Sequence, residues 1–149
     1  IGLDDPGLFI EYWQLPGVTQ EARQGGFFLT GDYAKRDEDG YIWFLGRRDD
    51  IINSFGFRLS PHEIERVIKT HPAIADCVAI EEAVAKDKNL VVICVITHAQ
   101  QSISEGDLLS FAAEHLASYK VPKKIYFMKQ FPRTANGKIV RKQLRASLI

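Results

Sequence analysis

Two apolar segments near the middle of the chain, Ile74–Ile80 and Leu90–Thr97, constrain the fold more than any other feature. Each is a short run of apolar residues, which is typical of a buried strand. A charged segment around Lys86–Asn89 separates them. The sequence therefore predicts two buried strands that pair as a hairpin.

Helices are predicted on both sides of this hairpin in sequence. One is expected to begin at Ser60, where Pro61 and Glu63 complete a capping box, and to end before His71. Another is expected to begin at Ser104, with apolar residues on one side. A short strand at 125–128 and a basic helix at 141–148 complete an α+β fold, a small C-terminal domain with a short hairpin and a three-stranded sheet packed by helices.

The first third of the chain carries a separate hairpin signal. Tyr33–Arg36 and Tyr41–Leu45 are rich in aromatic and branched residues, and Asp39-Gly40 between them suits a tight turn. A helical turn near Thr19–Gln24 and a strand at Phe27–Thr30 are predicted before it. We place the domain boundary after residue 48. Residues 1–48 are expected to be the terminal strands of a truncated large domain, and residues 49–149 a mobile lid domain.

Charge is distributed unevenly along the chain, although the net charge is zero. From Tyr119 to the end there are nine Lys or Arg and no Asp or Glu. Such a basic end indicates a polyanionic partner, either nucleic acid or a nucleotide such as ATP or coenzyme A, or simply a solvated basic surface. Charge alone leaves these alternatives open.

Several other classes of protein find no support in the sequence. The longest apolar run, residues 90–96, is too short to span a bilayer. Cys77 and Cys94 lie in apolar segments and make no disulfide scaffold, so a cytoplasmic location is expected. Gly137-Lys138 is not a phosphate-binding P-loop, because Pro132 and Ile139 replace its required Gly and Ser or Thr. The four histidines lack metal-ligand spacing, and no Gly-x-Ser-x-Gly elbow occurs.

Three short sequence motifs carry the most information about function. They are Thr30-Gly31-Asp32, the run 46–50 continuing into 56–65, and Tyr119–Pro122 followed by Pro132–Ile139. In order and spacing they resemble the later core motifs of the adenylate-forming superfamily, which holds acyl-CoA synthetases, luciferases and the adenylation domains of peptide synthetases. The resemblance covers nearly the whole chain.

This resemblance implies roles for particular residues in binding and activating ATP. Asp32 is expected to accept hydrogen bonds from the ribose hydroxyls, which suits a carboxylate with two acceptor oxygens. Arg47 is expected to contact ribose and phosphate, and Arg58 to lie near the phosphates. Lys138 is the expected catalytic residue, because an ammonium between the acid's carboxylate and the α-phosphate stabilises charge that develops in the transition state.

The resemblance also implies a moving domain with two working poses. Asp49 falls at the expected hinge, whose backbone torsion swings the small domain. In one pose the Lys138 loop serves adenylate formation, and in the other Gly56 lies along the pantetheine path of coenzyme A. Phe55 departs from the family pattern, since a small residue is usual there, and this bears on the coenzyme A step.

Within the superfamily, the run Asp49–Ser54 with Gly56 is most similar to acyl-CoA synthetases that act on acetate, medium-chain or aromatic acids. The expected function is acid–thiol ligation in fatty acid metabolism, with ATP, coenzyme A and Mg²⁺, the last bound mainly by a missing N-terminal domain. The chain alone is not expected to catalyse. No nucleic-acid partner and no membrane span are expected, and a homo-oligomer is left open. The alternatives are an adenylation domain that loads a carrier protein and a non-catalytic basic module that binds RNA or protein.

Overall fold

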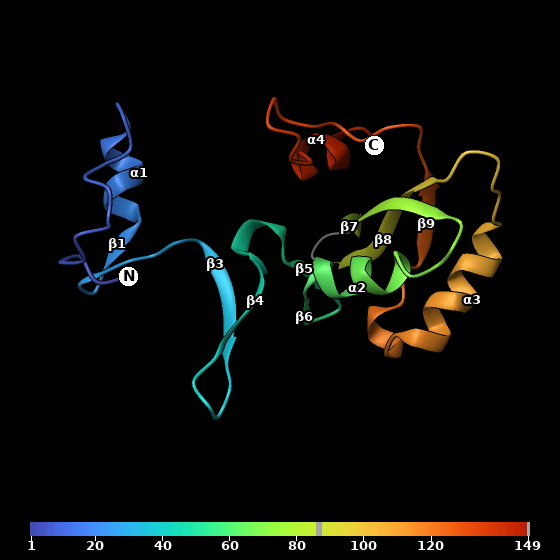
Figure 1. Cartoon of the computed structure of the whole chain (residues 1–149), viewed down its shortest axis with the longest axis horizontal. Helices are drawn as coiled ribbons and strands as arrows, with labels where there is room; N and C mark the ends of the chain where they lie inside the picture. The colour runs from blue at the N-terminus through green and yellow to red at the C-terminus, as the bar shows by residue number, and fades with distance from the viewer. Residues whose placement is uncertain (86–87, 149) are drawn as a thin grey trace. The chain divides into compact units, whose positions relative to one another are not determined.

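The computed structural model describes residues 1–85 and 88–148, and it divides the chain into two compact units, residues 1–49 and 50–149 (Figure 1). Each unit is described by itself below. Part of the predicted charged segment, residues 86 and 87, lies outside the described residues.

The second unit is built on a three-stranded sheet of β7 (Ile74–Ala85), β8 (Lys88–Thr97) and β9 (Lys124–Phe127). Strands β7 and β8 are antiparallel neighbours, which confirms the predicted hairpin, and both extend beyond the predicted runs. Strand β9 lies parallel to β8 on its other edge. The predicted α+β fold with a three-stranded sheet is therefore correct.

Both faces of this sheet are covered, which explains why the central parts of its two long strands are mostly apolar on both sides. Successive side chains of a strand point to opposite faces. One set packs with helices α2 (Pro61–Ile68) and α3 (Glu105–His115), and includes Cys77, Ala79, Val91, Ile93 and Val95. The alternate set packs with Leu144 of helix α4 (Arg141–Ala146) and includes Val78, Ile80, Val92 and Cys94.

Helix starts were predicted with mixed success. Ser104 caps α3 as expected, since its side chain accepts a hydrogen bond from the Asp107 amide at 3.1 Å. Ser60 is the N-cap of α2, but its side chain makes no capping hydrogen bond. Glu63 pairs with Lys120 at 2.5 Å. The predicted helix start at Ser60 is correct, but the side-chain hydrogen bond that Ser60 would contribute to the predicted capping box is not formed.

A short hairpin of β5 (Ile52–Ser54) and β6 (Phe57–Leu59) precedes α2. Its two turn residues, Phe55 and Gly56, have φ angles of 46° and 85°. Positive φ at both central residues is the signature of the turn that suits a two-residue hairpin loop. Glycine adopts this backbone readily, whereas a bulky residue such as Phe55 does so at a cost.

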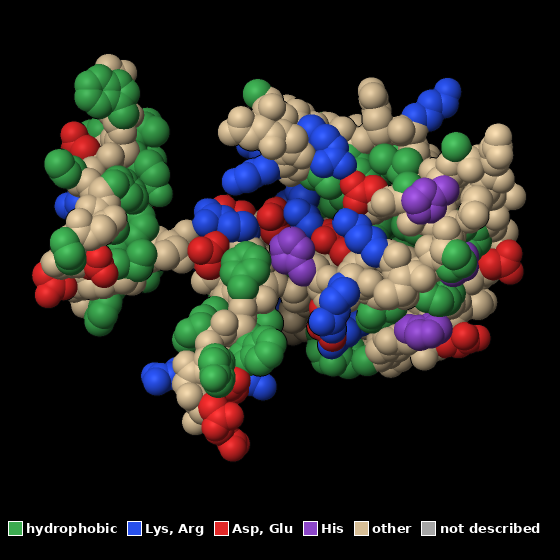
Figure 2. Space-filling view, in the orientation of Figure 1, with side chains coloured by type: hydrophobic (Ala, Val, Ile, Leu, Met, Phe, Trp, Pro, Cys, Tyr) green, Lys and Arg blue, Asp and Glu red, His purple; other side chains and the backbone are tan. Residues whose placement is uncertain are grey.

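The first unit contains α1 (Pro16–Glu21), β1 (Arg23–Gln24), β2 (Phe27–Phe28), β3 (Asp32–Arg36) and β4 (Ile42–Arg47). Strands β3 and β4 form the predicted antiparallel hairpin. Helix α1 begins earlier than predicted, because Pro16 occupies its first turn. The unit buries little, and its exposed large hydrophobic residues include Ile10, Trp13, Tyr41, Ile42 and Trp43. Figure 2 shows that many hydrophobic side chains lie on the molecular surface.

Two short 3₁₀ turns complete the chain. One, Arg48–Asp50, lies at the junction of the two units, and the other, Ser118–Lys120, precedes β9. No helix among the described residues is both long and apolar enough to cross a membrane.

Candidate functional site

Lys138 lies on a tight loop, residues 132–140, that its own hydrogen bonds close. The Thr134 amide donates to the Lys138 carbonyl at 2.8 Å, and the Gly137 amide donates to the Thr134 carbonyl at 2.8 Å. At the base, the Val140 amide donates to the Pro132 carbonyl at 2.8 Å. Gly137 has a φ of 80°, which this turn requires. The Lys138 side chain is exposed, so its ammonium can meet an incoming anion.

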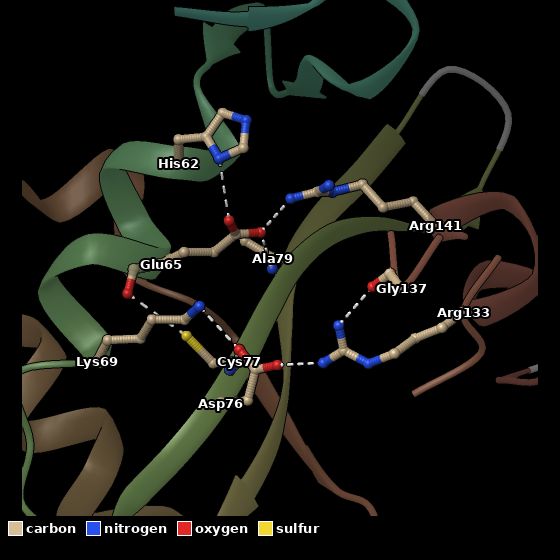
Figure 3. Close-up of polar contacts among 9 residues, drawn as sticks. All are labelled: His62, Glu65, Lys69, Asp76, Cys77, Ala79, Arg133, Gly137 and Arg141. Atoms are coloured by element: carbon tan, nitrogen blue, oxygen red, sulfur yellow. Dashed lines mark hydrogen bonds and ion pairs between the residues drawn. The ribbon is translucent and has the colours of Figure 1, made fainter. Parts of the chain in front are cut away.

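Arg133 ties this loop to the sheet. Its Nη1 donates to the Gly137 carbonyl at 2.8 Å, and its Nη2 donates to Asp76 Oδ2 at 2.7 Å (Figure 3). The other carboxylate oxygen of Asp76 accepts from Lys69 Nζ at 2.8 Å. Burial raises the pKa of Asp76, but the hydrogen bond and charge of Lys69, together with Arg133, outweigh it and hold the pKa below its usual value. Asp76 is therefore an ionised anchor.

Arg141 ties down the other end of the loop, where α4 begins. Its Nη2 lies 2.5 Å from Glu65 Oε1 on α2, and the same oxygen accepts from the Ala79 amide at 2.9 Å (Figure 3). His62 Nδ1 lies 3.3 Å from Glu65 Oε2. Arg141 Nη1 also lies 3.7 Å from Asp50 Oδ2. Glu65 is only 7% exposed, so groups from α2, from strand β7 and from the start of α4 meet at one buried carboxylate.

The first unit brings two predicted site residues together. Asp32 and Arg47 face each other in the β3–β4 ladder, and Arg47 Nη1 donates to Asp32 Oδ1 at 2.9 Å. The same nitrogen donates to the Thr30 carbonyl at 2.8 Å. A Cβ at Gly31 would lie 3.1 Å from Arg47 Nη2, so glycine leaves room for this guanidinium. Asp32 borders an open depression of about 350 Å³.

The predicted residues Gly56 and Arg58 lie at and beside the tip of the β5–β6 hairpin, and both are exposed. A Cβ at Gly56 would meet nothing within 4 Å, so the surface over this backbone is open. Next to it is a depression of about 350 Å³ within the second unit. Its wall includes Phe55 and Phe57, with Phe57 stacked on Tyr119 at a centroid distance of 4.7 Å.

The remaining predicted residue, Asp49, ends the first unit and lies within the 3₁₀ turn at the junction. The described residues hold no group of three or more His, Cys, Asp or Glu side chains that could bind a metal ion. We therefore assign no residue of this chain to Mg²⁺.

The anchors of the Lys138 loop escaped the sequence analysis. Asp76 and Arg133 are 57 residues apart, and Glu65 and Arg141 are 76 apart. The one available signal was an acidic residue inside an otherwise apolar strand, at Asp76, because a buried carboxylate requires a partner.

Comparison with known proteins decides the family. Residues 63–138, which include Glu65, Asp76, Arg133 and Lys138, match the family described as AMP-binding enzyme C-terminal domain. The chain belongs to this family. The predicted resemblance to adenylate-forming enzymes is thereby confirmed.

Two relatives of this AMP-binding C-terminal domain are named acyl-CoA synthetase or ligase. Mitochondrial acyl-coenzyme A synthetase ACSM1 of Mus musculus is 41% identical over 93% of the chain. The uncharacterised acyl–CoA ligase YtcI of Bacillus subtilis is 35% identical over 97% of the chain. The chain spans about a quarter of their length, 25% and 28%. A cytoplasmic location stays a prediction.

Solved structures share the fold over most of this chain. ATP-bound MatB from Rhodopseudomonas palustris is 34% identical, with a TM-score of 0.86 over 95% of this chain and 28% of MatB. The o-succinylbenzoate CoA synthetase MenE of Bacillus subtilis, in complex with its acyl-adenylate intermediate, is 31% identical, with a TM-score of 0.86 over 94% of this chain and 28% of MenE.

Proposed function

We propose that this chain is the C-terminal part of an AMP-forming acyl-CoA synthetase, and that Lys138 is its catalytic residue. The observation that carries the proposal is the exposed Lys138 ammonium on a loop that Arg133 and Arg141 fix to the sheet and to α2. The relatives that are acyl-CoA synthetases by name support it. The remaining parts of the active site would lie in a larger domain outside this chain.

In the first half-reaction, a carboxylate oxygen attacks the α-phosphorus of ATP. The bond between the α-phosphorus and the bridging oxygen breaks, pyrophosphate leaves, and an acyl-adenylate forms. Lys138 would reduce the repulsion between two anions and stabilise the charge of the transition state. Asp32 would accept from the ribose hydroxyls, with Arg47 beside it and Arg58 near the phosphates, since a guanidinium suits both phosphate and ribose oxygens.

In the second half-reaction, the thiol of coenzyme A loses its proton and attacks the acyl carbon. The acyl–phosphate bond breaks, AMP leaves, and a thioester forms. The open surface at Gly56 and the depression beside it suit the pantetheine arm, because no Cβ intrudes there. Torsion at Asp49 would alternate the two faces. Mg²⁺ would be held mainly outside this chain.

The proposal is tested with the full-length enzyme that carries this chain. We expect acid-dependent exchange of labelled pyrophosphate into ATP with at least one of acetate, butyrate, octanoate and benzoate. Lys138→Ala should abolish this exchange but retain thioester formation from supplied acyl-adenylate and coenzyme A. Normal exchange by Lys138→Ala would refute the assignment of Lys138. Transfer to a phosphopantetheinyl carrier but not to coenzyme A would replace the proposed acceptor.

A further inference from the structure

Arg133 connects the peptide next to Lys138 with the central sheet. Its Nη1 donates to the Gly137 carbonyl at 2.8 Å, and this carbonyl belongs to the peptide group that continues into Lys138. Its Nη2 donates to Asp76 Oδ2 at 2.7 Å (Figure 3). A planar guanidinium can hold two acceptors in fixed directions at once, which an ammonium on a flexible stem cannot do. Arg133 therefore sets where the Lys138 backbone lies relative to β7.

The far end of this link is itself fixed. Asp76 lies on β7, and its Oδ1 accepts from the Cys77 amide at 2.9 Å and from Lys69 Nζ at 2.8 Å. Its side chain is 22% exposed, and its pKa is held below the usual value as described above. The carboxylate is therefore charged, and Lys69, Arg133 and the Cys77 amide together hold its orientation. Asp76 therefore fixes the position of the loop relative to the sheet, through Arg133.

On its N-terminal side the loop follows Phe131, which is 6% exposed and packs in the core with Val78 and Ile80 of β7. Residues 133–138 are exposed, and the hydrogen bonds among Thr134, Gly137 and Lys138 close the loop without attaching it to the domain. On the other side Val140 leads directly into α4, which Leu144 buries against the sheet. Both ends of the loop are thus fixed at the core, and removing Arg133 would leave the exposed tip, residues 133–138, without its link to Asp76 and free to tilt about this base.

We propose that Arg133 is a positioning residue for Lys138, with Asp76 as its anchor. This inference rests on the proposed function, because it assigns Arg133 to the adenylation half-reaction alone. A displacement of about 1 Å from productive geometry can cost on the order of a hundredfold in rate. We therefore expect Arg133→Ala to lower the kcat of adenylation roughly ten- to hundredfold. The KM for ATP should change little, because the lost interaction belongs to the transition state.

The test measures both half-reactions in the full-length enzyme. Pyrophosphate exchange reports adenylation, and thioester formation from supplied acyl-adenylate reports the second step, in which Lys138 takes no part. Arg133→Ala should lower only the first. Arg133→Lys should be intermediate, because a single ammonium replaces one arm of the fork. Asp76→Asn should change the first step in the same direction, since the amide keeps the shape but loses the charge.

Lys69→Gln is the matched control. It removes one of the three groups that direct Asp76 and leaves the Cys77 amide and Arg133 in place. Adenylation should therefore stay within about twofold of the wild type, since the loss of one partly exposed ion pair is worth little. The midpoint of thermal unfolding of each variant shows whether the fold is retained. If Lys69→Gln lowers adenylation as much as Arg133→Ala does, Asp76 acts through general stability and the inference is wrong.

Two further results would overturn the inference. One is unchanged exchange by Arg133→Ala, and the other is an equal loss in both half-reactions. Failure of the proposed function looks different. In that case the wild-type enzyme shows no acid-dependent exchange with any acid of the panel, or Lys138→Ala retains it. An active wild type, an inactive Lys138→Ala and a fully active Arg133→Ala would refute the positioning role alone.

Discussion

Replacing Glu65 by methionine should destabilise the second unit more than any surface substitution. The carboxylate is 7% exposed, and its Oε1 accepts from Arg141 at 2.5 Å and from the Ala79 amide at 2.9 Å. Ala79 lies on β7, an edge strand of the sheet, so the carboxylate satisfies a buried amide that no neighbouring strand reaches. The substitution removes both interactions at once.

The magnitude follows from the burial of the two charges. The Arg141 side chain is 12% exposed, and removing one partner of a buried ion pair costs about 3–5 kcal/mol. This range already includes the cost of leaving the Ala79 amide without its hydrogen bond. Against a total stability of about 5–15 kcal/mol, such a loss is severe. For a domain of this size it corresponds to a fall of at least about 12 °C in the midpoint of thermal unfolding.

A double-mutant cycle separates the ion pair from general packing. Arg141→Met leaves Glu65 buried without its guanidinium partner and should cost a similar amount. The double substitution Glu65→Met/Arg141→Met should cost much less than the sum, because apolar residues of similar volume replace both charges. Urea denaturation of the chain measures each free energy of unfolding. Additive losses, or a loss below about 1 kcal/mol for Glu65→Met, would refute the reasoning. Lys124→Met, which breaks an exposed pair with Glu82, is the control and should leave the midpoint unchanged.

The remaining predictions test the backbone and the core. Phe55→Asn should raise stability by about 0.5–1 kcal/mol in urea denaturation, because Phe55 is 60% exposed and its φ of 46° suits asparagine better. Gly137→Ala, at a φ of 80°, should lower stability, whereas the helical control Gly106→Ala should raise it by about 0.5–1 kcal/mol. Burial raises the pKa of Cys77 and Cys94 to about 12, so iodoacetamide should label neither thiol until the chain unfolds. Because the unfolded thiols lose their protons first, stability should fall as pH rises from about 9 toward 12, and less so in Cys77→Ala/Cys94→Ala.

Local patterns predicted the elements of the fold well. The apolar runs gave β7 and β8, the Asp39-Gly40 signal gave the β3–β4 hairpin, and Ser104 gave the start of α3. Each depends on residues close in sequence, where period and turn chemistry act directly. The start of α2 shows the limit. Ser60 precedes this helix as predicted, but its side chain makes no capping hydrogen bond. The pairing of Glu63 with Lys120, far along the chain, could not be deduced from the local sequence.

In the candidate site, too, the sequence predicted some residues and could not predict their distant partners. Motifs singled out Asp32 and Arg47, and the ladder brings these two together because they stand in register on neighbouring strands. The partners of the Lys138 loop could not be deduced, since many acidic residues compete for Arg133 in the sequence. Only the packing of β7 against the loop selects Asp76. Sequence reasoning therefore proposes a candidate catalytic residue such as Lys138 more readily than the residues that position its loop.

Asp76 and Glu65, the two anchors of the Lys138 loop, bear on how the proposed motion of this domain would work. The sequence suggests Lys138 on a loop, and loops are commonly the mobile parts of a domain. Here Arg133 joins the loop to Asp76 on β7, and Arg141 joins its other end to Glu65 on α2. The loop thus follows the domain as one piece. If torsion at Asp49 moves the domain, Lys138 moves with it as a fixed part. The position of Lys138 relative to its substrates would then depend on the Arg133–Asp76 and Arg141–Glu65 contacts, and not on a loop that becomes ordered when ATP binds.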